Sequence, residues 1–78
     1  MPSIQTPHDL GLLLRTARQQ LGLTQAKLAL AAGVGVRFVV DLEAGKPTVR
    51  LASVMQVVAA LGGKLRIHGL PSLSSDSA

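Results

Sequence analysis

Glycines at four places divide this chain into short segments, and their spacing restricts it to a fold of short helices. They stand at Gly22, Gly33, Gly45 and Gly62–Gly63. Glycine is the residue most often found just past the end of a helix. Between the glycines, apolar residues recur at intervals of three and four, the period of a helix with one buried face. The sequence therefore predicts an all-α chain, with no segment approaching the roughly 20 apolar residues that a membrane span requires.

Helix-capping residues and apolar residues at helical spacing predict four helices along the chain. They are expected over residues 7–21, 25–32, 36–44 and about 49–61. Three of them follow a hydroxyl side chain that can accept from the first free N–H groups, at Thr6, Thr24 and Thr48. The predicted buried stripes are Leu10, Leu13, Leu14, Ala17 and Leu21; Leu28, Ala29 and Ala32; Val39 and Leu42; and Leu51, Val54, Met55, Val58 and Leu61.

The period changes after the fourth helix. Residues 64–68 alternate between polar and apolar, which is the pattern of a half-buried strand. One strand cannot form a sheet alone, so it pairs either with the same strand of a second copy or with the extended segment of residues 3–5. The first alternative is favoured because a chain of 78 residues buries little surface and a homodimer adds contact area. The predicted dimer contacts are Leu65, Ile67 and Leu70, with Lys64, Arg66 and His68 on the other face of the sheet.

The charge balance favours a polyanionic partner. Residues 1–70 carry eight Lys and Arg against three Asp and Glu, a net charge of +5, which suits nucleic acid. The N-terminus has neither the basic nor the apolar region of a signal peptide, so the expected location is the cytoplasm, with no membrane partner.

Composition and spacing argue against catalysis. The chain has no cysteine, which excludes disulfides, thiolate metal sites and cysteine nucleophiles. His8 and His68 lie near opposite ends, and neither has a second ligand at metal spacing. The glycine-containing segments lack the full pattern of a nucleotide-binding loop. We therefore expect no enzyme activity, cofactor, metal or small-molecule substrate.

The most specific pattern runs from Gly22 to Lys46. Two short helices joined by a tight turn over residues 31–35 are typical of a helix-turn-helix, whose second helix enters the DNA major groove. This segment resembles the Cro and phage-repressor type of helix-turn-helix in its Leu-Thr-Gln opening, its Leu-Ala, its Gly-Val turn and its Leu-Glu-x-Gly-Lys ending. The resemblance extends from about Leu10 to Leu61. It implies a repressor-like domain of four to five helices.

A closer likeness lies further along the chain. The segment Arg37–Thr48, followed by a helix and Gly-x-Lys-Leu-Arg-Ile, is similar to HipB-like antitoxins. That resemblance implies a homodimer that binds double-stranded operator DNA, represses its own operon and sequesters a HipA-like Ser/Thr kinase toxin. Two alternatives stay open: a stand-alone phage or plasmid repressor, and an interaction module that has lost DNA binding. The expected domains are an N-terminal extension (1–6), the helix-turn-helix domain (7–63), the dimerisation strand (64–70) and a disordered tail (71–78).

Candidate DNA contacts fall at the start of the second helix, along the third helix and just after it. The resemblance places Gln25 against a phosphate. Arg37 can pair with O6 and N7 of guanine or contact a phosphate, and both readings remain open. Asp41 stands four residues later, where a salt bridge to Arg37 is favoured over contact with cytosine. The complete set is Gln25, Lys27, Val36, Arg37, Val40, Asp41, Lys46 and Arg50.

Two charged residues border the predicted core and have a structural role. Arg18 and Glu43 each lie one turn from residues of a buried stripe, so each charge needs a partner. The resemblance implies that they pair across the first and third helices. Phe38, the chain's one aromatic residue, is expected to pack against the fourth helix or a subunit boundary, with thymine contact as the minority alternative.

Overall fold

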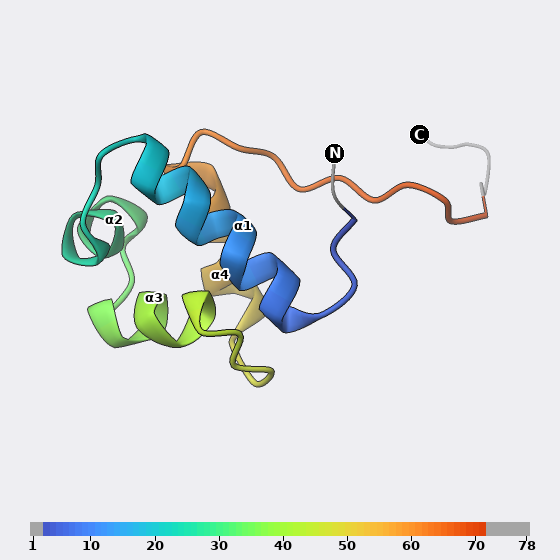
Figure 1. The fold of residues 1–78 in the computed structure, drawn as a ribbon, viewed down its shortest axis with the longest axis horizontal. Coiled ribbons are helices and arrows are strands. Elements are labelled where there is room, and N and C mark those ends of the chain that lie inside the picture. The colour runs from blue at the N-terminus through green and yellow to red at the C-terminus, as the bar shows by residue number, and fades with distance from the viewer. Residues whose placement is uncertain (1–2, 72–78) are drawn as a thin grey trace.

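The computed structural model describes residues 3–71 and contains four helices in this range (Figure 1). The helices are α1 (Pro7–Gln20), α2 (Gln25–Ala32), α3 (Val36–Glu43) and α4 (Leu51–Ala60). The expectation of an all-α chain of short helices is thus confirmed. None of the helices within residues 3–71 is long and apolar enough to cross a membrane. The predicted tail lies outside the described residues, apart from Pro71.

The helix ends follow the sequence signals in the first half of the chain. The Thr6 hydroxyl accepts from the N–H of Asp9 at 3.1 Å, and that of Thr24 accepts from the N–H of Lys27 at 3.1 Å. Both predicted caps are therefore present.

The predicted cap of the fourth helix is wrong. Thr48 lies in a turn, and α4 begins three residues later, after Arg50 as its N-cap residue. Thr48 does not cap α4 because residues 46–50 have to cross the start of α1 before the next helix can begin. Residues 46–50 carry the chain from the end of α3 past the start of α1, where Lys46, Pro47 and Val49 line one groove with Thr6, Pro7 and Leu10.

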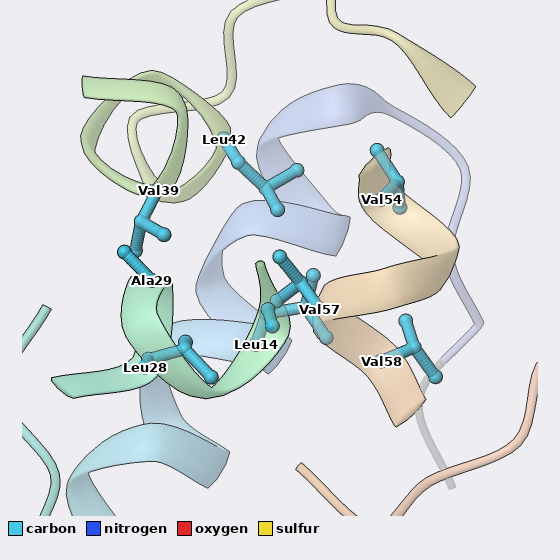
Figure 2. Close-up of a cluster of buried hydrophobic side chains, with 9 residues drawn as sticks. Leu14, Leu28, Ala29, Val39, Leu42, Val54, Val57 and Val58 are labelled. Atoms are coloured by element: carbon cyan, nitrogen blue, oxygen red, sulfur yellow. The ribbon is translucent and has the colours of Figure 1, made fainter. Parts of the chain in front are cut away.

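The core forms where all four helices meet. Four side chains, from α2, α3 and α4, are fully buried, and each contributes roughly 1.5–3 kcal/mol: Leu28, Val39, Leu42 and Val57. Figure 2 shows the two α3 side chains, Val39 and Leu42, in one cluster with apolar side chains of α1, α2 and α4. The most extensive helix contacts are between α2 and α3, α1 and α3, and α2 and α4. Because α3 contacts both α1 and α2, its orientation is set from two sides.

The predicted stripes of α1 and α4 are partly wrong. In α4, Val57 is fully buried, whereas Leu51 and Met55 are 65% and 51% exposed. The apolar residues of α4 occupy two flanks of the helix, and packing against α2 chooses the flank of Val54, Val57 and Val58. Leu13 of α1 and Leu21, the residue that caps the end of this helix, are also exposed. The side of α1 that faces the core is the one that carries Gly11 and Leu14.

The segment after α4 is extended, and within residues 3–71 it forms no ladder, either with residues 3–5 or with itself. Figure 1 shows it leaving the four helices as an open chain. Its apolar side chains, Leu65, Ile67 and Leu70, are 50%, 71% and 70% exposed. A strand that pairs with a second copy is not tested by one chain, so that pairing stays a prediction.

Helices α1 and α3 make backbone contact at Gly11. A Cβ added there would lie 2.5 Å from the carbonyl oxygen of Leu42 and 2.7 Å from that of Glu43. These are main-chain atoms at the end of α3, which cannot move aside as a flexible side chain would. Glycine at this position therefore fixes how closely the last turn of α3 approaches α1.

We expect Gly11→Ala to destabilise the fold by about 2 kcal/mol, as overpacking of a tight contact does. This is the reverse of the roughly 1 kcal/mol gain that alanine brings inside an open helix. Urea unfolding followed by circular dichroism measures the difference. Gly35→Ala is the matched control because no atom lies within 4 Å of a Cβ there, and its free energy of unfolding should change by less than about 1 kcal/mol. Equal stability of Gly11→Ala and the wild type would contradict the backbone contact.

Candidate nucleic-acid interface

Helices α2 and α3 are joined by a turn of three residues, Gly33–Gly35. Gly33 has a φ of 72°, in the left-handed region that glycine adopts without strain. The N–H of Gly33 donates to the carbonyl oxygen of Leu30 at 3.3 Å, and that of Val34 to Ala29 at 3.0 Å, which ends α2 sharply. The two helices are therefore joined by a tight turn and packed against each other, as the sequence pattern predicts.

The two faces of α3 differ sharply in burial. Val39, Leu42 and Glu43 are buried, while Val36, Arg37 and Val40 are exposed on the opposite side. The exposed residues are among those predicted to contact DNA. One face of this short helix is thus packed into the protein, and the opposite face is exposed.

Two further charged side chains, Asp41 and Lys46, lie beside Arg37. Among the other predicted contacts, Lys27, Lys46 and Arg50 are exposed, and Gln25 and Asp41 are partly buried. Asp41 accepts a hydrogen bond from Nε of Arg37 at 3.2 Å, and its second oxygen lies 3.6 Å from Nζ of Lys46. The pairing of Arg37 with Asp41 is the one favoured from their spacing.

Arg18 and Glu43 form a two-pronged ion pair between α1 and α3. Nε and Nη2 of Arg18 donate to the two carboxylate oxygens of Glu43 at 2.7 and 3.0 Å, and Nη1 donates to the carbonyl oxygen of Leu23 at 2.8 Å. The side chains are only 11% and 4% exposed. The hydrogen bond to Glu43 raises the pKa of the Arg18 guanidinium, with burial opposing and Coulomb attraction adding to it. Because that pKa starts high, Arg18 stays charged throughout the neutral range.

Gln25 joins this ion pair, a role that sequence reasoning missed. Its Nε2 donates to Oε1 of Glu43 at 3.1 Å. The amide therefore keeps one N–H for an outside acceptor such as the phosphate expected there. No sequence signal links Gln25 to Glu43, since 18 residues separate them and the contact depends on the angle between α2 and α3. The three side chains tie α1, α2 and α3 together at one point.

A shallow groove separates the turn of the α2–α3 unit from α4. It is lined by Gly33, Val34, Gly35, Phe38, Arg50, Ser53 and Gln56. Phe38 is half-buried and packs against the core, in line with the favoured expectation. Within the described residues, neither α3 nor α4 has a side-chain cap on its first N–H groups. Both helix starts therefore leave backbone donors available beside Arg50.

No metal site accompanies these residues. Between residues 3 and 71 there is no group of three or more His, Cys, Asp or Glu side chains that could hold a metal ion.

Comparisons with known proteins agree with this geometry. Residues 14–67 match the helix-turn-helix family HTH_3. The chain is 52% identical over 64 residues to an uncharacterised HTH-type transcriptional regulator, y4mF, of Sinorhizobium fredii, covering 82% of this chain and 84% of that protein.

Solved structures share the fold. A chain of the HipA-HipB-O2-O3 complex superposes with a TM-score of 0.82 at 21% identity, covering 91% of this chain and all of that one. The clp gene regulator ClgR from C. glutamicum superposes with a TM-score of 0.70 at 31% identity, over 82% of each chain.

The ion-pair network makes Glu43 far more sensitive to substitution than an exposed acid. We expect Glu43→Gln to lower the free energy of unfolding by about 3 kcal/mol, because it leaves the Arg18 charge buried without its counter-charge. Asp41→Asn, which breaks an exposed pair, should cost less than about 1 kcal/mol. Urea titration of both variants measures the contrast. Equal losses would show that Glu43 contributes no more than a surface carboxylate.

Proposed function

The chain belongs to the helix-turn-helix family, and on that premise we propose that it is a transcriptional repressor that places α3 in the major groove of operator DNA. The observation that carries this proposal is the exposed face of α3. Val36, Arg37 and Val40 contribute no core packing, and the helix behind them is held by α1 and α2. A rigid helix with a free face is what direct contact with base edges requires. This function needs no cofactor and no catalytic residue.

Phosphate contacts would fix the position of α3 on the duplex. Lys27 and the free amide N–H of Gln25 lie at the start of α2, and Lys46 and Arg50 follow α3 along the chain. The free backbone donors at the starts of α3 and α4 add further contacts. The net charge of +5 on residues 1–70 provides the long-range attraction.

The proposed active form is a homodimer. Leu51 and Met55 of α4 are exposed together with Leu65, Ile67 and Leu70 of the extended segment, and apolar side chains in such number favour a protein contact. The strand over residues 64–70 would pair with its copy in a second chain. Two α3 helices related by a two-fold axis would then meet successive half-sites about one DNA turn apart.

The finer proposal is that this repressor is the antitoxin of a toxin–antitoxin pair. The likeness of Arg37–Thr48 to HipB-like antitoxins supports it, as does the shared fold with a chain of the HipA-HipB-O2-O3 complex. The proposed second partner is a HipA-like Ser/Thr kinase, and the proposed place of action is the bacterial cytoplasm, on the nucleoid. A stand-alone regulator is the second candidate, favoured by the relative with 52% identity, which is described as an HTH-type transcriptional regulator.

We expect the wild type to bind the DNA upstream of its own gene, with an affinity that falls by roughly a hundredfold or more between about 50 and 200 mM salt. Arg37→Ala should weaken binding about tenfold through loss of a base or phosphate contact, while sedimentation shows an unchanged dimer. Arg15→Ala is the control because it removes the same charge from α1, outside the α2–α3 unit. Binding by Arg37→Ala that equals the wild type across the salt series would contradict the role of α3.

The antitoxin role is tested by purifying the tagged full-length protein from its source cells and washing it with nuclease. Mass spectrometry should then find a kinase similar to HipA in about equal amount, because the nuclease removes proteins that are bridged only by DNA. A homodimer without any companion would contradict the antitoxin role and favour the stand-alone regulator.

A further inference from the structure

Asp41 is an acidic side chain on the side of α3 that the proposed function turns toward DNA. Three carboxylate side chains lie in residues 3–71, and the other two have structural roles: Asp9 accepts from the backbone at the start of α1, and Glu43 holds Arg18. A carboxylate facing phosphates weakens DNA binding by repulsion. A carboxylate on this face is therefore expected to improve DNA recognition in some other way that offsets the repulsion.

The two oxygens of Asp41 face two different cations. Oδ1 accepts from Nε of Arg37 at 3.2 Å, and Oδ2 lies 3.6 Å from Nζ of Lys46. The Arg37 side chain is 86% exposed, and exposed pairs at this spacing stabilise a helix only slightly. Asp41 therefore adds little to the stability of the fold, and its main effect is on where the Arg37 and Lys46 side chains are held.

The hydrogen bond uses one edge of the Arg37 guanidinium. Nε donates to Asp41, and within residues 3–71 neither Nη1 nor Nη2 of Arg37 donates a hydrogen bond. Those two nitrogens form the planar fork that pairs with O6 and N7 of guanine. Without Asp41, a side chain this exposed would lose more rotamer freedom on reaching a base.

Lys46 connects the same carboxylate to the turn after α3. That turn is held against α1, because a Cβ on the adjacent Gly45 would lie 2.9 Å from the Cα of His8. The backbone that carries Lys46 is therefore fixed relative to α3. Its flexible side chain and compact ammonium can leave Asp41 for a phosphate, whereas the closer bond from Nε of Arg37 stays in place.

We propose that Asp41 is a specificity-determining residue that positions Arg37 to recognise guanine and, by holding Lys46, weakens binding to DNA of the wrong sequence. This inference rests on the proposed function and adds to it the residue that sets base preference. It assigns Asp41 no base contact of its own.

The test begins with selection of the sequence that the full-length wild type prefers from a library of random duplexes. Affinities are then measured for that duplex, for a scrambled duplex, and for duplexes in which each guanine is replaced. We expect one guanine whose replacement costs the wild type about tenfold and costs Arg37→Ala nothing. Asp41→Asn should lose about fivefold of that preference and bind the scrambled duplex about twofold more tightly. Asp41→Glu, which keeps the carboxylate, should retain part of the preference.

Two controls separate positioning from a general charge effect. Asp9→Asn removes the same charge at the start of α1 and should leave the guanine preference unchanged. In an Arg37→Ala background, Asp41→Asn should have no effect on base preference, because no fork remains to be positioned. A wild type that selects a sequence, together with an Asp41→Asn variant of unchanged preference, would overturn this inference alone. A wild type that selects no sequence would overturn the proposed function and this inference with it.

Discussion

The buried carboxylate of Glu43 is the contact on which the arrangement of the first three helices depends. Glu43 is the last residue of α3. Its two carboxylate oxygens accept hydrogen bonds from Arg18 of α1 and Gln25 of α2. Apolar contacts between these helices are non-directional, so they favour close packing without choosing one angle. Charged hydrogen bonds have narrow geometric limits, and any other angle would leave a charge buried without its partner. The ion pair thus fixes the angles between helices whose core consists of aliphatic side chains.

Local signals in the sequence locate each of the four helices to within about two residues at either end. Thr6 and Thr24 cap their helices as expected, since a hydroxyl before an apolar stripe acts within one turn of chain. Thr48 carries the same local signal and does not cap a helix, because the path around the start of α1 needs those residues as a turn. The burial of Val57 in place of Met55 has a similar origin. Which flank of a helix faces the core depends on its neighbours, and no stretch of ten residues contains that information.

In the candidate site, too, contacts within one helix could be predicted from the spacing of residues in the sequence, whereas contacts between elements could not. The pairing of Arg37 with Asp41 follows from their spacing of four on one helix. The contact of Gln25 with Glu43 and that of Lys46 with Asp41 depend on how separate elements meet, so the spacing of residues gives no indication of them. The strand expected from residues 64–68 differs from both, because its partner would be another molecule.

The exposed face of α3 is separate from everything that keeps the protein folded. Val36, Arg37 and Val40 lie outside the core, whereas the contacts of this helix with the core come from its other side, from Phe38, Val39, Leu42 and Glu43. Mutations on the outer face can therefore accumulate without the folding penalty that usually limits change in a small domain. Under the proposed function, in which this face contacts the bases, duplicated copies of such a gene can drift toward different target sequences while they retain one scaffold. A genome can thus accommodate several regulators of this kind that do not bind one another's targets.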